Sequence, residues 1–456
     1  MMILDLNFVY QTFAIPLPLD QANQKVRQVS TNSQAIGEGD VFVALKGERF
    51  DAHDFVLDAL NKGAILALVR EDFQSSDPRV IRVPDTLAAL GQLAKAWRDC
   101  LDIKVVGITG SSGKTTVKEM TASIAREALG KAAVLATQGN LNNDIGLPLT
   151  LLQLTAAHKV AIIEMGMNHF GELTYLTHLA RPDVALVNNA LRAHVGCGFD
   201  GVDDIARAKS EIYAGLNQQG LALIPCEDAN VAIFIDATQG LSTQTFGLNQ
   251  GDVHAENVVL SPLSSRFELV CAAGRYVIEL PTAGAHNVAN AVAAASLALA
   301  LGWSLQNIAQ GLTQFSNISG RLQVKSASGG ARVLDDTYNA NPDSMKAALK
   351  VLAQFDAPRF FVMGDMGELG EGAEQLHVEV GAFAQELGIE TLYALGPLSQ
   401  AAATAFGAGA EHFDSMDALN AALLQTVPAD ATVLVKGSRF MKMERAVKAL
   451  VDNQSR

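Results

Sequence analysis

One segment of this chain limits the possible folds more than any other. The glycine-rich stretch GITGSSGKTT, residues 107–116, lies between an apolar run at 105–109 and a helix-forming run from Lys114 to about residue 129. A strand, a glycine turn and a helix in this order gather backbone N–H groups at the positive end of the helix, where they can surround an anion. The segment therefore predicts a parallel α/β sheet with a phosphate-binding loop.

The spacing within this loop is a variant. The common pattern has four residues between its first glycine and the Gly-Lys pair, which would need glycine where Ile108 stands. What remains is G-x-x-G-K-T-T. Lys114 is expected to reach the β- and γ-phosphates of a nucleotide, and the Thr115 hydroxyl is expected to ligate Mg²⁺. The residues predicted to bind the nucleotide here are Gly110, Ser111, Ser112, Gly113, Lys114, Thr115 and Thr116.

Short apolar runs alternate with helical segments along most of the chain. This alternation predicts parallel sheets covered by helices on both faces, with an antiparallel excursion in the β-rich stretch 251–281. The expected fold is α/β with three domains: a small α/β domain at 1–84, a central parallel-sheet domain with the phosphate-binding loop at 85–315, and a Rossmann-like domain at 316–456. The predicted strands are residues 41–45, 65–69, 105–109, 160–164, 184–187, 221–224, 332–334, 359–363, 391–395 and 432–436.

Composition narrows the class of protein. With 456 residues, the chain is long enough for about three domains of ~150 residues. The net charge of −14 (34 basic and 48 acidic residues) argues against a nucleic-acid-binding coat, and 49% hydrophobic residues argue against disorder. The longest apolar run, residues 291–303, is too short to span a membrane. We therefore expect a globular enzyme with no nucleic acid and no membrane span.

The cysteines and the first residues indicate a compartment. The four cysteines are scattered and form no C-x-x-C pair, which predicts reduced, mostly buried thiols and no disulfide frame or zinc site. No basic residue precedes Lys25, so the start lacks the cationic region of a secretory signal. Both observations favour a cytoplasmic protein.

Polar residues that follow predicted strands are further site candidates. Glu164 ends the strand 160–164, and a carboxylate at that edge of a parallel sheet can hold Mg²⁺. His194 follows the next strand, although a lone histidine is more often structural. Lys209 has the pattern of a solvated lysine on an amphipathic helix. The loop DDTYNANP at 335–342 is unusually polar, and KGSR at 436–439 is a cationic turn suited to an anion.

Together these motifs resemble the Mur ligase family, the ATP-dependent enzymes that build the peptidoglycan precursor. The match runs in order over nearly the whole chain: TGSSGKTT at 109–116, EMG at 164–166, AH at 193–194, AKSEI at 208–212, HN at 286–287 and GR at 320–321. Four more stretches favour members that add D-alanyl-D-alanine to a UDP-N-acetylmuramoyl-tripeptide: GERFDAHDF at 47–55, GNLNNDIGLP at 139–148, DTYNANPDS at 336–344 and GDMGELG at 364–370.

The resemblance implies roles for residues that patterns alone leave open. It reverses the interpretation of Lys209, which in this family is carbamylated and binds Mg²⁺. It implies catalytic roles for Lys114, Glu164, His194 and Lys209, and metal ligation by Thr115, Glu164, His194 and Lys209. Asn287 is expected near adenine, with Arg321 and Asp336 also contacting the nucleotide. The implied substrate-binding residues are Asn32, Ser33 and Arg49 for the UDP end, Asn140, Asn142 and Asn143 for the muramoyl part, and Asn339 and Asn341.

The implied reaction is acyl activation by ATP. The peptide carboxylate attacks the γ-phosphate to give an acyl phosphate, and the amine of D-Ala-D-Ala then attacks to give an amide. ATP and Mg²⁺ are the expected cofactors, and we expect a monomer. Three alternatives remain open: another amide ligase of the same family, a folylpolyglutamate synthetase, or a P-loop NTPase that hydrolyses ATP as a switch or motor.

Overall fold

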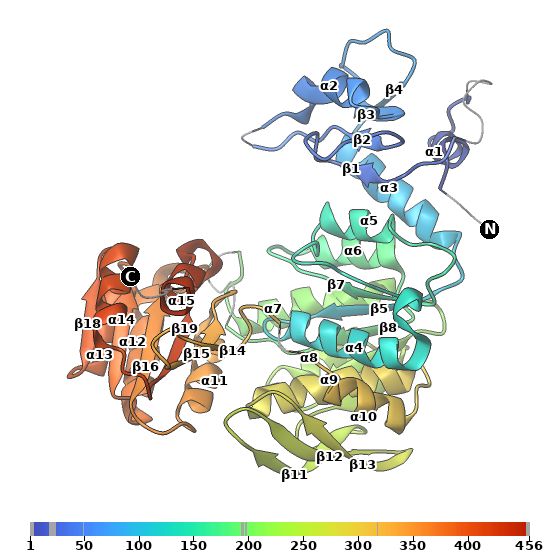
Figure 1. The fold of residues 1–456 in the computed structure, drawn as a ribbon. Coiled ribbons are helices and arrows are strands. Elements are labelled where there is room, and N and C mark those ends of the chain that lie inside the picture. Colours follow the sequence, from blue (N-terminus) through green and yellow to red (C-terminus); the bar gives the residue numbers. More distant parts are fainter. Residues whose placement is uncertain are drawn as a thin grey trace. The chain divides into compact units, whose positions relative to one another are not determined.

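The computed structural model describes residues 4–17, 24–48, 50–192, 196, 198–316 and 318–452. The chain forms two compact units that each combine separate segments. The first unit comprises Met1–Thr109, Ala128–Leu186 and Glu211–Ala222, and the second comprises Gly110–Glu127, Val187–Ser210 and Leu223–Arg456. Figure 1 shows the order of the elements along the chain.

The chain begins with a small parallel sheet. Its strands follow one another in the order β1 (Val29–Ser30), β2 (Val41–Val43), β3 (Leu66–Arg70) and β4 (Val80–Val83). Buried apolar residues of β2 and β3, such as Phe42 and Val69, pack against α2 (Val56–Asn61), which follows the 3-10 helix Ala52–Phe55. Helix α1 (Leu6–Thr12) precedes the sheet. The strands predicted at 41–45 and 65–69 are confirmed, within a few residues.

A long helix, α3 (Thr86–Asp99), follows this sheet and begins at an aspartate cap. The carboxylate of Asp85 accepts hydrogen bonds from the backbone N–H groups of Leu87 at 2.7 Å and Ala88 at 2.9 Å. These two bonds satisfy donors that the first turn of a helix leaves without intrahelical partners, and so fix where the helix starts.

A six-stranded sheet contains the strand that leads into the glycine-rich loop. Its order is β10 (Ser242–Phe246), β9 (Leu221–Pro225), β8 (Val184–Val187), β5 (Lys104–Thr109), β7 (Val160–Glu164) and β6 (Val134–Ala136). β7 pairs in parallel with both β5 and β6. The helices that alternate with these strands are α4 (Lys114–Leu129), α5 (Gly146–Leu151), α6 (Glu172–Ala180), α7 (Val202–Ser210) and α8 (Val231–Ala237).

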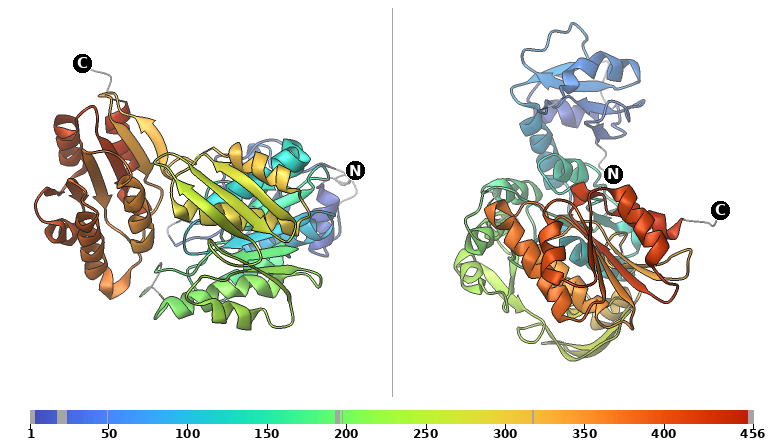
Figure 2. Two further views of the ribbon diagram at one scale, coloured as in Figure 1. Left: turned by 90° about the horizontal axis from the view of Figure 1, so that it is seen from below. Right: turned by 90° about the vertical axis from the view of Figure 1, so that its left-hand side faces the viewer.

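The β-rich stretch forms the predicted antiparallel excursion. β11 (His254–Leu260), β12 (Ser265–Cys271) and β13 (Gly274–Leu280) pair as a meander, seen as three adjacent arrows in Figure 2. One face, with Phe267, Leu269 and Ile278, is buried. The helices α9 (Ala285–Ala300) and α10 (Leu305–Thr313) contact these strands. Most of α9 is buried, as expected for a helix that serves core packing.

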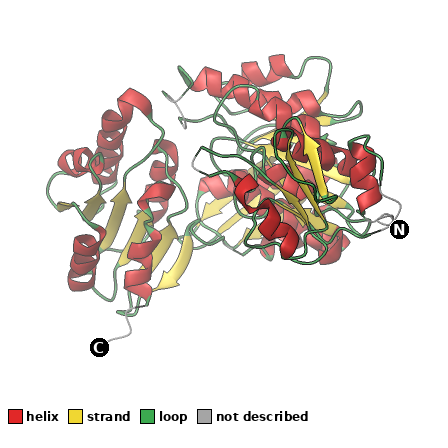
Figure 3. Ribbon diagram, turned by 90° about the horizontal axis from the view of Figure 1, so that it is seen from above, coloured by secondary structure: helices red, strands yellow, loops and turns green. Residues whose placement is uncertain are grey.

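The C-terminal sheet is parallel except for one edge strand. Its order is β14 (Gln323–Ser326), β15 (Arg332–Asp336), β19 (Thr432–Lys436), β16 (Arg359–Gly364), β17 (Thr391–Leu395) and β18 (Ala410–Phe413), with β14 antiparallel to β15. The helices are α11 (Pro342–Leu352), α12 (Ala373–Glu386), α13 (Ser399–Phe406), α14 (Met416–Thr426) and α15 (Glu444–Val451), and Figure 3 shows helices on both faces of this sheet.

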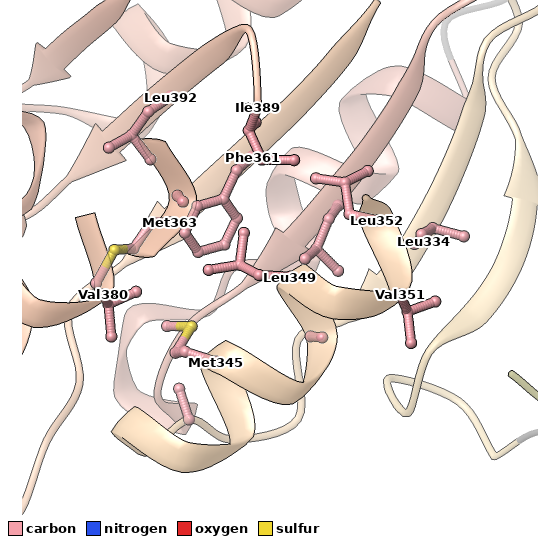
Figure 4. Close-up of a cluster of buried hydrophobic side chains, with 14 of the residues drawn as sticks. Leu334, Met345, Leu349, Val351, Leu352, Phe361, Met363, Val380, Ile389 and Leu392 are labelled. Atoms are coloured by element: carbon pink, nitrogen blue, oxygen red, sulfur yellow. The ribbon is translucent and has the colours of Figure 1, made fainter. Parts of the chain in front are cut away.

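The strands of this sheet are apolar at successive positions because both of its faces are buried. Leu334, Phe361 and Met363 point to a cluster shared with α11, α12 and α13, part of which Figure 4 shows. Their neighbours along the strands, Val333 and Val362, point to the opposite cluster with α14 and α15. The carboxyl ends of these strands therefore lie on a rigid, doubly covered sheet.

The sequence leads us to expect no membrane span and mostly buried cysteines, and the structure bears on both expectations. Within the part of the chain that the structure describes, every helix is too short or too polar to cross a membrane. The expectation of mostly buried cysteines is wrong: Cys100 is exposed at the end of α3, and Cys226 and Cys271 are partly exposed. All three are free thiols, and Cys197 lies outside the described residues. Scattered positions predicted the absence of a disulfide frame but carry no information on burial.

Candidate functional site

The glycine-rich loop joins β5 to α4 as predicted, and one of its glycines is required by its surroundings. Gly113 has φ of +80°, in the left-handed region that side chains rarely adopt. A Cβ atom there would lie 2.3 Å from Asn290 Oδ1 and 2.5 Å from Asn188 Nδ2. The first intrahelical bond, from Val117 N–H to Gly113 O, follows directly. The N–H groups ahead of it point along the helix axis toward the loop.

The phosphate-binding loop is held in place by Asn188 and Asn189, which the sequence patterns did not predict as site residues. The side-chain amide of Asn189 accepts a hydrogen bond from Ser112 N–H at 2.9 Å and donates one to Ser112 O at 3.1 Å. Asn188 Nδ2 also donates to Ser112 O, and to Asn290 Oδ1 at 3.0 Å. Ser111 N–H donates to the carbonyl of Asn189. The N–H groups of Ser111 and Ser112 are therefore both engaged within the protein.

Two lysines of the second unit influence each other electrostatically. Lys114 Nζ donates to Gly110 O at 2.6 Å, which places its ammonium group over the loop. Lys209 is only 2% exposed, and burial, reinforced by the charge of Lys114, lowers its pKa well below the usual value. The pattern-based interpretation of Lys209 as a solvated lysine is therefore wrong. Position 209 lies one turn after Ile205, on the buried face of α7.

Glu164 is a buried carboxylate at the end of β7. It is 3% exposed, and its Oε1 accepts a hydrogen bond from Asn142 Nδ2 at 2.9 Å. Its Oε2 is buried without a hydrogen-bond partner among the described residues. A buried acceptor of this kind is uncommon and fits coordination of a cation by carboxylate oxygen.

The predicted substrate residues of the first unit have local partners. Asn143 Oδ1 accepts from Gly146 N–H at the start of α5, and Asn140 is exposed. Asn32 is exposed and accepts from Gln34 N–H, whereas Ser33 is buried. Arg49, predicted to contact the UDP end, and His194, a predicted metal ligand, lie outside the described residues.

The polar loop after β15 lies beside the end of β19. Asp336 and Lys436 are opposite each other in the strand register, and their side chains pair at 2.6 Å in a buried setting. Lys436 Nζ also donates to Asn339 O at 2.9 Å. Burial lowers the pKa of Lys436, and the carboxylate of Asp336 opposes that shift. The charge of Lys436 is thus offset internally, so the cationic turn presents Arg439 rather than Lys436 to solvent.

Other predicted nucleotide contacts are also positioned by neighbours. The guanidinium of Arg321 lies over the ring of Tyr338, 4.1 Å from its centroid, and its Nε is buried without a hydrogen-bond partner among the described residues. Asn287 donates to Thr282 Oγ1 and Ala283 O, and its Oδ1 accepts from Asn290 Nδ2. The asparagines at positions 188, 189, 287 and 290 thus form one amide network beside the loop.

His286 belongs to the HN motif at 286–287, and the family resemblance implies no role for it. Desolvation lowers its pKa to about 4, although part of the residue reaches the surface; Asp336 opposes this shift and Lys436 reinforces it. The imidazole is therefore neutral at pH 7. The HN pair in the first turn of α9, separated from Gly284 by one residue, is the signal that could have identified it.

This shift predicts an acid-sensitive contribution of His286 to stability. In the unfolded chain the imidazole gains a proton near pH 6.5, but the folded protein resists protonation down to about pH 4. Folding stability is therefore lost as the pH falls from about 6.5 to about 4. We expect His286→Asn to remove this part of the loss. Denaturant unfolding at pH 7, 6, 5 and 4 should give a flatter curve for the variant, while His178→Asn, which changes an exposed histidine of α6, should follow the parent. Parallel curves for His286→Asn and the parent would contradict the prediction.

Comparison with known proteins identifies relatives along the whole chain. Three family models match: "Mur ligase family, catalytic domain" over residues 25–98, "Mur ligase middle domain" over 108–298, and "Mur ligase, glutamate ligase domain" over 320–439. A relative from Escherichia coli K12, named UDP-N-acetylmuramoyl-tripeptide–D-alanyl-D-alanine ligase, is 41% identical over 439 residues, which are 95% of this chain and 96% of that protein.

Solved structures agree with this similarity. A crystal structure of MurF from Acinetobacter baumannii is 38% identical with a TM-score of 0.90, covering 99% of this chain and 100% of that one. The structure of MurF ligase from Thermotoga maritima in complex with ADP is 27% identical with a TM-score of 0.83, covering 93% and 97% of the two chains. The expected α/β fold with parallel sheets is confirmed, and the chain matches three Mur ligase domains.

Proposed function

Since this chain belongs to the Mur ligase family, we propose that it joins D-alanyl-D-alanine to a UDP-N-acetylmuramoyl-tripeptide, driven by ATP, in the synthesis of the peptidoglycan precursor. The observation that carries this proposal is the similarity, over 95% of the chain, to a relative with this named activity. The related ligase that binds ADP supports ATP as the nucleotide. Because ATP and a UDP-linked peptide are its substrates, we place the reaction in the cytoplasm.

We assign one part of the reaction to each sequence-defined domain. Residues 1–84 would bind the UDP end of the substrate, with Asn32, Ser33 and Arg49 as contacts. Residues 85–315 would bind ATP, and residues 316–456 would bring the dipeptide and complete the nucleotide site. The muramoyl part is assigned to Asn140, Asn142 and Asn143, and further substrate contacts to Asn339 and Asn341.

The proposed reaction has two chemical steps. An oxygen of the peptide carboxylate attacks the γ-phosphorus of ATP, forming an acyl phosphate while ADP leaves. The dipeptide amine then attacks the acyl carbon and loses a proton, and the tetrahedral intermediate releases inorganic phosphate to give the amide. Carboxylate and triphosphate repel each other, so both steps depend on groups that offset negative charge.

The phosphate-binding loop provides several such groups. The N–H groups of residues 113–116 lie at the positive end of α4, and Gly113 has no side chain to keep phosphate away. Lys114 Nζ would exchange its bond to Gly110 O for a phosphate oxygen. Asn287, Arg321 and Asp336 are the further nucleotide contacts that we propose.

The donor chemistry fits Mg²⁺. Thr115, Glu164, His194 and Lys209 are the proposed ligands, and the buried, unpartnered Oε2 of Glu164 supports a cation there. Bound Mg²⁺ would offset charge on the triphosphate and the attacking carboxylate. Lys209 can take part only as an anion. Its lowered pKa supplies the neutral amine that adds CO₂ and releases a proton, giving a carbamate.

The asparagine brace of the loop leads to a prediction about nucleotide affinity. Asn189→Ala removes both hydrogen bonds to Ser112, at about 1 kcal/mol each, so we expect ADP to bind about 10- to 30-fold more weakly. Asn189→Asp retains the acceptor for Ser112 N–H, but it loses the donor and adds a negative charge beside the anion, so it should bind ADP at least as weakly as the alanine variant. Calorimetric titration with ADP measures both, with exposed Asn32→Ala as the control. Equal affinity in Asn189→Ala and the parent would show that the loop holds its shape without this brace.

The test of the proposed function is the dependence of phosphate release on both acceptor substrates. We expect release from ATP only when UDP-N-acetylmuramoyl-tripeptide and D-Ala-D-Ala are both present, with one amide detected by mass spectrometry per phosphate. Full-rate release without them would indicate an NTPase switch instead. Ligation of a single amino acid in place of the dipeptide would indicate another amide ligase of the family.

A further inference from the structure

Arg192 contacts two carboxylates that belong to two different helices. It lies in the loop after β8, three residues beyond Asn189. Its Nη2 is 2.6 Å from Asp343 Oδ1 of α11, and its backbone N–H donates to the other carboxylate oxygen at 3.2 Å. Its Nη1 and Nη2 also donate to the two oxygens of Glu379 on α12, at 2.9 and 3.0 Å. Lys346 Nζ contacts Glu379 as well.

This cluster is stronger than an ordinary surface ion pair. Its four side chains are about one-quarter to one-third exposed, and the guanidinium uses several donors at once. The two carboxylates raise the pKa of Arg192, and the cations hold the pKa of Glu379 at about 2. The pairing of Arg192 with Glu379 therefore stays charged throughout the neutral range.

The cluster contacts the first turn of α11. A second contact, from Asn341, joins the start of this helix to the phosphate-binding loop. Asn341 caps this helix through a hydrogen bond from Ser344 N–H, and its Nδ2 donates to Ser112 Oγ at 3.0 Å. Asp343 is two residues further on. The first turn of α11 is thus attached at two points, to Ser112 and to Arg192. Asn189 is connected to both attachment points. Its side chain is hydrogen-bonded to Ser112, and it lies in the same loop as Arg192.

We propose that Arg192 is a positioning residue for ligation: by holding Asp343 and Glu379, it sets the loop at 336–342 in register with the phosphate-binding loop. This inference rests on the proposed function, which assigns nucleotide and substrate contacts to both loops. Reactants that meet between two loops react only in a narrow range of geometries, and a displacement of about 1 Å costs about 100-fold in rate. Arg192 itself need not touch a substrate for this effect.

The expected signature separates kcat from nucleotide binding. In Arg192→Ala, Asn188 and Asn189 still hold the phosphate-binding loop, so ADP affinity should change less than about threefold. The first turn of α11 loses its contact with Arg192 and keeps only the one with Ser112, so kcat for ligation should fall about 10- to 100-fold. Arg192→Lys, which keeps the charge but not the forked geometry, should lie between the parent and the alanine variant.

Charge exchange provides the decisive test. Arg192→Asp alone places three carboxylates together and should lower kcat at least as far as Arg192→Ala. Adding Asp343→Arg restores opposite charges and should recover at least about tenfold of the lost kcat. The matched control is Arg207→Ala, which removes an exposed arginine paired with Asp204. ADP titration and thermal unfolding of each variant report folding separately from ligation.

The outcomes distinguish this inference from the function on which it rests. A parent chain that ligates, with reduced kcat in Arg192→Ala and recovery in the double variant, supports both. Ligation at the parent rate by Arg192→Ala, or no recovery by charge exchange in a folded double variant, overturns the inference and leaves the function standing. A parent chain that releases phosphate without ligating overturns the proposed function, and with it the inference.

Discussion

Replacing Lys209 with alanine is expected to lower kcat for ligation by about 10³-fold or more. The proposed role of this side chain is to present a carbamate to Mg²⁺, and alanine provides neither the anion nor any group able to form it. The loss of one charge-stabilising group in a water-excluded site costs about 10²–10³ in rate, and here a charge-bearing ligand is lost. A small carboxylic acid such as acetate can occupy the space that alanine leaves and should restore part of the activity.

Measurements of kcat and of ADP binding in control variants distinguish loss of the carbamate from general damage to the protein. Arg207→Ala, an exposed change on the same helix, should keep the parent kcat, and Lys209→Ala should still bind ADP because the phosphate-binding loop is intact. Lys209→Arg introduces a cation that cannot add CO₂, so it should be as inactive as the alanine variant and should not respond to acetate. Ligation by Lys209→Ala at the parent rate would remove Lys209 from the active site.

The main fold could be predicted because hydrophobic periodicity reports burial of whole elements. The apolar run 432–436 is a strand on a sheet buried on both faces, and the structure confirms the same bounds. Short elements gave no such signal. β14 (Gln323–Ser326) is an edge strand with alternating partial exposure, and its polar composition resembles a loop. Its antiparallel pairing with β15 depends on tertiary contacts that no local pattern encodes.

Some residues of the candidate site could also be predicted from the sequence, and others could not. Gly113 and Lys114 could be found because backbone geometry and chain order define a phosphate-binding loop. Asn189 could not, because its contact with Ser112 joins positions 77 residues apart along the chain. Lys209 shows a third case. Its helix pattern indicated solvent, the family resemblance indicated a site, and only the structure shows that the side chain is buried.

Glu164→Gln is expected to lower kcat by about 10²- to 10³-fold while leaving the protein equally or more stable. The proposed role of Glu164 is to bring a negative charge to Mg²⁺, which an amide of the same shape does not carry. The glutamine oxygen can still accept from Asn142 Nδ2. The unpartnered Oε2 is a charged oxygen buried away from water, and its burial costs folding free energy. A neutral group at this position should therefore raise the free energy of unfolding by up to about 1 kcal/mol.

A fall in kcat together with an unchanged or higher free energy of unfolding distinguishes a functional carboxylate from a structural one. A structural Glu164 would lose stability on conversion to glutamine, and any loss of kcat would follow the fraction of unfolded protein. Denaturant unfolding without Mg²⁺ and steady-state ligation with saturating Mg²⁺ measure the two quantities independently. Glu172→Gln, at a partly exposed position at the start of α6 in the same unit, should leave kcat unchanged. Reduced stability together with retained ligation in Glu164→Gln would show that the orphaned oxygen has no part in binding the cation.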